Sequence, residues 1–68
     1  MAIVKGKLFI QDNLEKGKKE VRSKGGSIIK TIRCDDCDGF EAYEIIFTMD
    51  KDTLGNLVKE SWDWSYVN

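Results

Sequence analysis

Residues 27–49 read SIIKTIRCDDCDGFEAYEIIFTM, and this stretch decides the fold. Both of its arms are rich in β-branched and aromatic residues, which favour strands. These are Ile28, Ile29 and Ile32 in the first arm, and Tyr43, Ile45, Ile46 and Phe47 in the second. Between the arms stands Asp38-Gly39, a pair typical of two-residue turns that need positive φ. The stretch therefore predicts a β-hairpin that turns at Asp38-Gly39.

This turn fixes the register of the predicted hairpin. It places Arg33 opposite Glu44, an opposite-charge pair across the two strands. It also sets Ile32 against Ile45 and Ile28 against Met49. Because side chains alternate between faces, one face becomes almost entirely apolar, with Lys30 as its only charged member. That predicted core face consists of Ile28, Ile32, Cys34, Tyr43, Ile45, Phe47 and Met49.

A turn at Asp35-Asp36 is the alternative. It would pair Cys34 with Cys37 and Lys30 with Glu41. This alternative lacks a glycine and leaves Ile45 to Met49 without partners in the first arm. The Asp38-Gly39 turn is therefore preferred.

The composition indicates one globular domain, residues 1–68, with 41% hydrophobic residues. A chain of this length buries only about 60% of its unfolded surface, so its core is thin. No apolar run approaches the roughly 18 residues of a membrane span, and no signal-peptide pattern opens the chain. Two cysteines are too few for a disulfide scaffold. We therefore expect a cytoplasmic protein that does not enter the membrane.

The net charge of −1 conceals a strong asymmetry along the chain. Residues 1–33 hold nine Lys or Arg and three acids, whereas residues 34–68 hold two Lys and nine acids. The first half thus carries +6 (9 − 3) and the second −7 (2 − 9). Such a split indicates either a polarised surface that steers a partner, or two halves that neutralise one another in a folded sheet. For antiparallel neighbours the second interpretation is favoured.

The segment before the hairpin predicts two further elements. Residues 1–10 alternate well enough for a strand, with Val4, Leu8 and Ile10 on one face and Gly6 as a bulge. Residues 11–26 fit either a helix capped by Asp12 and closed by Gly25, or a polar edge strand over Lys18–Lys24. Because a helix would bury only Leu14 and Val21 and would contain Gly17, the strand is narrowly favoured.

The segment after the hairpin changes to a helical period. Asp52 or Thr53 can cap a helix near 53–61, and Leu54, Leu57 and Val58 recur at helical spacing. The tail from Trp62 alternates aromatic and polar residues, as strands do. The predicted fold is therefore a small α+β domain. It has an antiparallel sheet of three to five strands built on the hairpin 27–49, with one short helix near 53–61.

Metal and redox chemistry have weak support. Cys34-x-x-Cys37 offers only two thiols, and a chain without histidine needs a dimer or acidic ligands to complete a zinc site. The neighbouring aspartates disfavour the thiolate that redox chemistry requires. Asp35, Asp36, Asp38 and Glu41 depart from the spacing of a calcium loop. We therefore expect no cofactor, and a zinc-bridged dimer ranks only third among the hypotheses of function.

Nucleic-acid binding ranks second. The basic run of Lys16, Lys18, Lys19, Arg22 and Lys24 suits phosphates, but the aromatic residues that stack on bases lie mostly in the acidic half. A solvated surface explains the same run without any ligand. Catalysis has little support, because no triad, no carboxylate pair in an apolar setting and no phosphate-binding glycine loop is present.

The aromatic tail suggests the preferred function. Trp62, Trp64 and Tyr66 are of the residue types that dominate interface hot spots, and a core this small cannot bury all three. The alternative is that Trp62 and Tyr66 cap the core and only Trp64 is exposed. We expect a non-enzymatic protein-binding module, an adaptor or inhibitor, with homodimerisation as one mode of association. Small acidic domains of phages and mobile elements offer an analogy, which rests on no particular residue.

Overall fold

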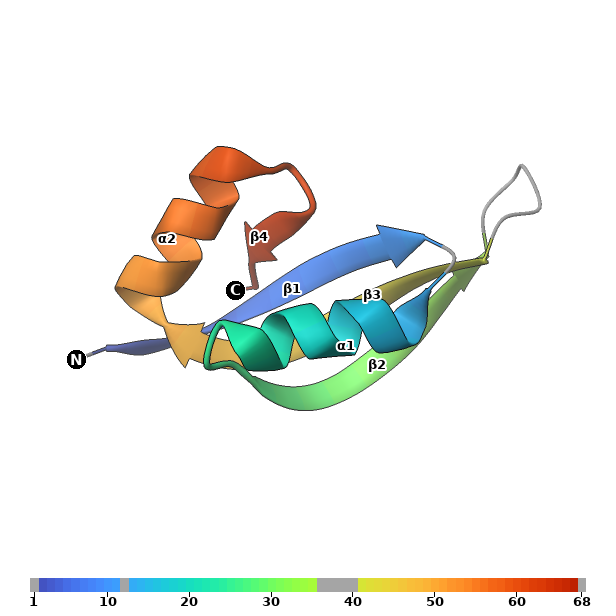
Figure 1. Cartoon of the computed structure of the whole chain (residues 1–68), viewed down its shortest axis with the longest axis horizontal. Coiled ribbons are helices and arrows are strands. Elements are labelled where there is room, and N and C mark those ends of the chain that lie inside the picture. Colours follow the sequence, from blue (N-terminus) through green and yellow to red (C-terminus); the bar gives the residue numbers. More distant parts are fainter. Residues whose placement is uncertain (1, 12, 36–40, 68) are drawn as a thin grey trace.

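The computed structural model describes residues 2–11, 13–35 and 41–67. They form six elements (Figure 1): β1 (Ile3–Gln11), α1 (Leu14–Ser23), β2 (Ser27–Asp35), β3 (Glu41–Asp50), α2 (Lys51–Glu60) and β4 (Trp64–Tyr66). The strands build one antiparallel sheet in the order β2-β3-β1-β4. Each helix links two strands that lie on either side of a third, which is the split β-α-β arrangement of the ferredoxin-like topology. The predicted small α+β domain is confirmed.

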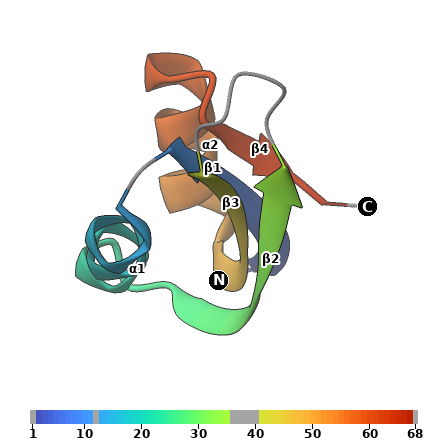
Figure 2. The same cartoon turned by 90° about the vertical axis from the view of Figure 1, so that its right-hand side faces the viewer.

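Both helices cover the same face of the sheet (Figure 2). Residues directly opposite in an antiparallel pair share a face, so Leu8 of β1 and Ile45 of β3 point the same way. Val21 of α1 and Leu54 of α2 belong to the buried cluster that these two residues help to form. We call the opposite side, which bears the odd-numbered residues of β1 and the even-numbered residues of β3, the open face. No described helix lies on it.

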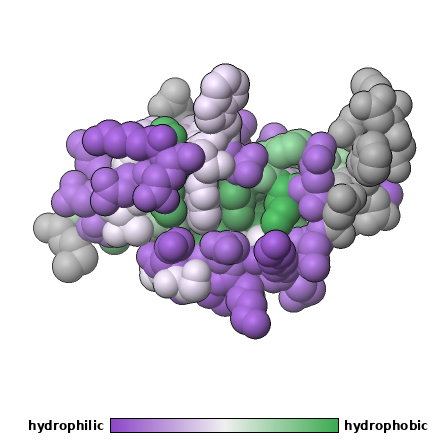
Figure 3. Space-filling model, turned by 45° about the horizontal axis from the view of Figure 1, so that its top comes forward, coloured by the Kyte–Doolittle hydropathy of each residue, from purple (hydrophilic) through white to green (hydrophobic). Residues whose placement is uncertain are grey.

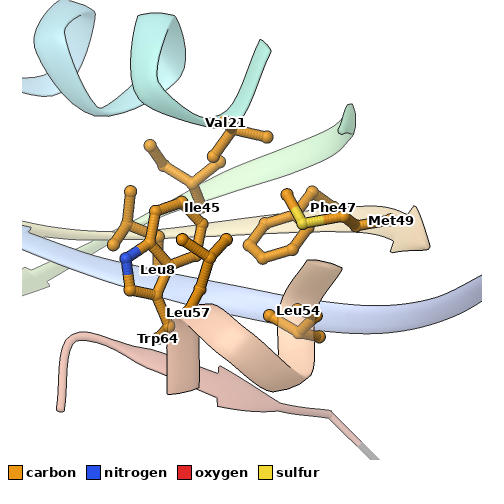
Figure 4. Close-up of a cluster of buried hydrophobic side chains, with 8 residues drawn as sticks. All are labelled: Leu8, Val21, Ile45, Phe47, Met49, Leu54, Leu57 and Trp64. Carbon is orange, nitrogen blue, oxygen red and sulfur yellow. The ribbon is translucent and has the colours of Figure 1, made fainter. Parts of the chain in front are cut away.

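The core is one cluster between the sheet and the helices (Figure 4). It comprises Leu8, Val21, Ile45, Phe47, Met49, Leu54, Leu57 and Trp64. Phe47 is completely buried and meets Trp64 edge to face, with ring centroids 5.6 Å apart and ring planes at 75°. Burying one such side chain contributes about 1.5–3 kcal/mol, so a few residues supply much of the stability of so small a domain.

The structure corrects the predicted polar strand at Lys18–Lys24, which belongs largely to α1. Asn13 caps the helix, because its side-chain oxygen accepts a hydrogen bond from the Lys16 N–H at 3.1 Å. The predicted cap, Asp12, lies outside the described residues. The capping hydrogen bond therefore stabilises a helix in this segment, although its few apolar positions favour the strand prediction.

The C-terminal end of α1 is a Schellman motif. The Gly25 N–H donates to the Arg22 carbonyl at 3.0 Å, and the Gly26 N–H donates to the Val21 carbonyl at 2.9 Å. Gly25 has φ +82°, a conformation that costs glycine little and other residues more. The sequence had identified Gly25 as the terminating residue of the helical alternative, and here that role is confirmed.

Gly17 is the reason why α1 can lie close to the sheet. A methyl group at this position would stand 2.8 Å from Ile45 Cδ1 and 2.9 Å from Ile10 Cδ1. The glycine that counted against a helix in the sequence is thus the position at which the helix contacts the core. Gly6 of β1 has the same function on the other side, since a methyl group there would stand 2.7 Å from Leu54 Cδ2.

β2 and β3 form the predicted hairpin, but the predicted register is wrong. Arg33 lies opposite Tyr43 and Ile32 opposite Glu44, one residue away from the expected pairs. The predicted turn at Asp38-Gly39 lies outside the described residues. Gly6 is not a bulge, because β1 pairs with β3 in one continuous register from Ile3 to Gln11.

A register shift between Ile28 and Lys30 explains which residues of β2 reach the core. It leaves Ile28 opposite Phe47 on the helix-covered face, and it moves Lys30 opposite Ile46 on the open face. The one charged residue of the predicted core face is thereby kept out of the core, where an unpaired ammonium group is very costly. The same shift moves Ile32 and Cys34 to the open face, which corrects their predicted place in the core.

α2 confirms the one predicted helix, near 53–61, and begins two residues earlier than expected. Asp50, rather than Asp52 or Thr53, is its cap, and its carboxylate accepts from the Thr53 N–H at 3.3 Å. Trp64–Tyr66 forms the short strand β4, as the alternation of the tail predicts. Two backbone bonds extend the pairing of β4 with β1, from the Phe9 N–H to Asp63 and from the Val67 N–H to Lys5.

The two glycines inside helices provide a matched test of this packing. Alanine stabilises a helix interior by about 1 kcal/mol relative to glycine. At Gly55 the added methyl would stand 3.3 Å from the hydroxyl of half-exposed Tyr66, which has room to move, so Gly55→Ala should be neutral or stabilising. At Gly17 overpacking of the core should outweigh the helical gain, so Gly17→Ala should lower the unfolding free energy by about 1 kcal/mol or more.

Urea unfolding of the two variants and the parent protein measures this difference. A rise in the midpoint for Gly17→Ala equal to that for Gly55→Ala would show that α1 does not press against Ile45 and Ile10.

Candidate functional site

The three aromatic residues of the predicted partner-binding tail have three different environments. Trp64 is 8% exposed and belongs to the core, Tyr66 is 46% exposed, and Trp62 is 100% exposed. The alternative in which Trp62 and Tyr66 cap the core and Trp64 is exposed is therefore wrong. The pairing of β4 with β1 gives the reason, since Trp64 lies opposite Leu8 on the helix-covered face.

Trp62 is presented by a short turn that is anchored on both sides. On one side, the Ser61 N–H donates to the Leu57 carbonyl of α2 at 3.1 Å. On the other, the Asp63 carbonyl accepts from the Phe9 N–H of β1 at 2.9 Å. The Asp63 N–H also donates to Ser61 Oγ at 3.3 Å. The backbone around Trp62 is thus fixed while its indole stays in solvent, an arrangement that reduces the entropy lost when a partner binds.

An open groove of about 730 Å³ adjoins this turn. It runs between α1, the second half of β1 and the start of β4, and Figure 3 shows an apolar area in the middle of the molecule with hydrophilic residues on both sides. Its lining comprises Leu8, Phe9, Ile10, Gln11, Asn13, Lys16, Glu20, Asp63 and Trp64. Apolar residues of the sheet and charged residues of α1 and the turn thus line one concave surface.

Tyr66 belongs to a different and shallower hollow of about 540 Å³. It lies over α2, where the absence of a side chain at Gly55 leaves room for the phenol ring. Lys51 and Lys59 also line this hollow. Trp62 and Tyr66, which are four residues apart in the chain, are therefore not brought into one described pocket.

α1 carries the predicted basic run, but it does not gather the run into one patch. Lys16 and Glu20 line the groove on one flank of the helix. Lys18 and Arg22 fall on the opposite flank, because the buried stripe that contains Val21 separates the two sides. Lys18 also pairs with Glu15 at 3.6 Å. Lys19 and Lys24 are exposed. The charges that phosphates would contact are thus spread around the helix and mixed with acids.

The cysteine motif is only partly described. Cys34 is free and half-buried on the open face, opposite Ala42, whereas Cys37 lies outside the described residues, as do Asp36 and Asp38 of the acidic loop. In the part of the chain that is described, no group of three or more His, Cys, Asp or Glu is placed to hold a metal ion. The zinc and calcium hypotheses stay untested at this loop.

Comparisons with family models, with curated proteins and with solved structures found no match. Within residues 2–11, 13–35 and 41–67, no helix is long and apolar enough to cross a membrane.

Sequence reasoning missed the groove, although part of its signal was present. Alternation in β1 had placed Leu8 and Ile10 together on one face of the sheet. The missing information was that α1 and the start of β4 lie on either side of the second half of β1 and leave it partly open, which depends on the tertiary arrangement. Phe9 and Asp63 meet through a backbone bond between residues that are distant in sequence, which no local pattern indicates.

The different environments of the two tryptophans give a direct prediction. Trp64→Ala should lower the unfolding free energy by about 3–5 kcal/mol, because it removes a buried ring that packs on Phe47. Trp62→Ala should change it by no more than about 0.5 kcal/mol, since the side chain is entirely in solvent. Thermal unfolding followed by far-ultraviolet circular dichroism compares the two. Equal losses would contradict the assignment of Trp64, and not Trp62, to the core.

Proposed function

We propose that this domain is a non-enzymatic protein-binding module that acts as an adaptor or inhibitor. The observation that carries the proposal is the full exposure of Trp62 in a turn whose backbone is held on both sides. Tryptophan is highly buried on average in folded proteins, and it is among the residues most enriched in interface hot spots. A rigidly presented indole in solvent is the form that such a hot spot takes before its partner binds.

The groove next to the turn supports the same function. Its apolar members Leu8, Ile10 and Trp64 would be the centre of an interface, and Lys16, Glu20 and Asp63 would be its polar rim. Protein interfaces are built in this way, with a desolvated centre and a solvated margin. A partner side chain entering the groove would come close to Trp62, because Asp63, the next residue, lines the groove.

Trp62 can be tested as the contact residue before the partner is identified. The protein is expressed in the cells from which it comes, with a photo-crosslinking amino acid in place of Trp62. Irradiation should then crosslink it to a partner. The same group placed at Ile3, which is 61% exposed on the open face, should not capture it. With that partner purified, Trp62→Ala should weaken binding about 30-fold, the equivalent of a hot spot of about 2 kcal/mol.

Ile3→Ala is the control and should leave the affinity unchanged. Crosslinks that are absent at Trp62, or that occur equally at both positions, would overturn the proposal. A crosslink to a second copy of this chain would identify the module as a homodimer that uses the same turn.

Nucleic-acid binding by α1 is a second candidate, supported by the exposed or half-exposed placement of Lys16, Lys18, Lys19 and Arg22 on the helix and of Lys24 directly after it. Its weakness is the distribution of these charges around the helix and the acids between them. The two candidates differ in their dependence on salt, because phosphate contacts release counterions and an interface centred on an indole does not.

Binding of a fluorescent 20-nucleotide single strand between about 50 and 200 mM salt tests this candidate. If α1 binds the strand, log affinity should fall with log salt by roughly 0.7 per phosphate contact. The triple change Lys18→Glu, Lys19→Glu, Arg22→Glu should then abolish binding, whereas Trp62→Ala should not. We expect no binding near 150 mM salt, and measurable binding with this mutational pattern would make nucleic acid the ligand.

A further inference from the structure

The charged residues on either side of Trp62 are acidic. Glu60 ends α2 two residues before Trp62, and Asp63 follows it directly; both acids are exposed. Residues 60–66 contain no lysine or arginine. Neither of the two ion pairs found within residues 2–11, 13–35 and 41–67 involves these two carboxylates. The exposed indole thus stands between two acids that form no ion pair with a described cation.

The C-terminal end of α2 adds to this negative potential. The last carbonyls of a helix have no partner within the helix, and the aligned peptide dipoles give that end about half a negative charge. The Ser61 N–H satisfies the Leu57 carbonyl at 3.1 Å, and the carbonyls after Leu57 point along the helix axis toward the Trp62 turn. A cation is therefore favoured beside the indole, and an anion is not.

The nearest lysines do not cancel this potential. Lys59 lines the other hollow, over α2, together with Tyr66. Lys16 lines the groove, but Glu20, which is one turn further along the same flank of α1, lines it too. With Asp63, the described residues that line the groove include one cation and two acids. The turn and the groove together therefore carry an excess of negative charge.

This charge selects the side chain that the exposed indole can bind. Hot spots tend to pair with hot spots of the partner, where tryptophan, tyrosine and arginine are enriched, and of these only arginine is cationic. A guanidinium stacks on the face of an indole and also donates paired hydrogen bonds to a carboxylate. Nucleic-acid bases stack on aromatic rings as well, but their phosphates would be repelled by Glu60 and Asp63.

The groove can hold a residue that neighbours such an arginine in the partner. Its volume of about 730 Å³ lies within the usual range of ligand pockets, and Leu8, Ile10 and Trp64 provide its apolar surface. Asp63 lines the groove and adjoins Trp62 in the chain, so a partner segment can contact both at once. An apolar side chain in the groove would contribute affinity, and the arginine would contribute selectivity.

We propose that the Trp62 turn binds an arginine in a basic segment of the partner protein. The guanidinium stacks on the Trp62 indole, its charge faces the carboxylates of Asp63 and Glu60, and a neighbouring apolar side chain enters the groove. The proposal rests on the proposed protein-binding function and names the chemistry of the partner. It also gives a role to the negative charge that the second half of the chain gathers around an exposed tryptophan.

The test begins with a displayed library of random nonapeptides, selected on the intact domain at about 150 mM salt. Selected peptides should be enriched in arginine more than in lysine. In a synthetic copy of the best binder, citrulline in place of that arginine keeps the shape of the side chain but removes its charge. This change should weaken binding about tenfold, and lysine at the same position should weaken it less.

Variants of the domain test the two parts of the site separately. In Trp62→Leu, which keeps an apolar side chain but removes the ring, the preference for arginine over citrulline should fall to about threefold. Asp63→Asn with Glu60→Gln should weaken binding of the arginine peptide about threefold, mainly by slowing association. Glu15→Gln with Asp52→Asn removes the same charge from the first turns of α1 and α2 and should leave the affinity unchanged. Urea unfolding shows whether each variant is folded.

The outcomes separate this proposal from the proposed function. Peptides that lack a cationic residue, and whose binding is lost in Trp62→Ala, would overturn the arginine and support the proposed function. Equal affinity for the arginine and citrulline peptides would do the same. Peptides that bind Trp62→Ala as well as the parent protein would overturn both. A dimer in sedimentation that is lost in Trp62→Ala would overturn the assignment to another protein in favour of a second copy. A library without binders overturns the proposal.

Discussion

The structure depends on the need to cover one face of β3. Ile45, Phe47 and Met49 lie on that face, and each is at most 1% exposed. Four strands about 4.8 Å apart form a sheet wider than one helix of about 10–12 Å, so the two helices divide the task. Val21 of α1 and Leu54 of α2 belong to the same cluster as these strand residues. A chain of this length buries only about 60% of its unfolded surface, and its described residues hold no second core that could compensate for the loss of this one.

The close contact between layers requires the absence of side chains at particular positions. Gly17 lets α1 approach Ile45 and Ile10, and Gly6 leaves space in β1 for Phe47 and Leu54. Trp64 then packs against Phe47 from the short strand β4. The two glycines that weaken local propensity are thus used where helix and sheet come closest. This explains why local propensity gave the wrong element for the segment that forms α1, whereas the hairpin arms, the helix near 53–61 and the tail strand were predicted correctly.

Patterns with a local cause were predictable from the sequence, and those with a tertiary cause were not. The hairpin arms, the helix around Leu54 and Leu57, and the terminating Gly25 follow from residue types and their spacing. The register of the hairpin does not, because alternation along β2 puts Lys30 on the same face as Ile28. The shift that separates them is favoured only once the helices make that face a core. The aromatic tail was recognised as the candidate site, but the pairing of Trp64 with Leu8 decides which ring is buried.

Because both helices pack on one face of the sheet, their placement also determines which parts of the sheet remain uncovered. Both helices lie over the same face of the sheet, so neither protects the edge of β2, and the space between α1, β1 and the start of β4 becomes the groove beside Trp62. The irregularity that removes Lys30 from the core places its charge beside the uncovered edge. Natural edge strands use lysine and bulges against uncontrolled pairing with other chains. The same two features work against pairing of β2 with other chains, so the shift that keeps Lys30 out of the core also protects the edge against aggregation.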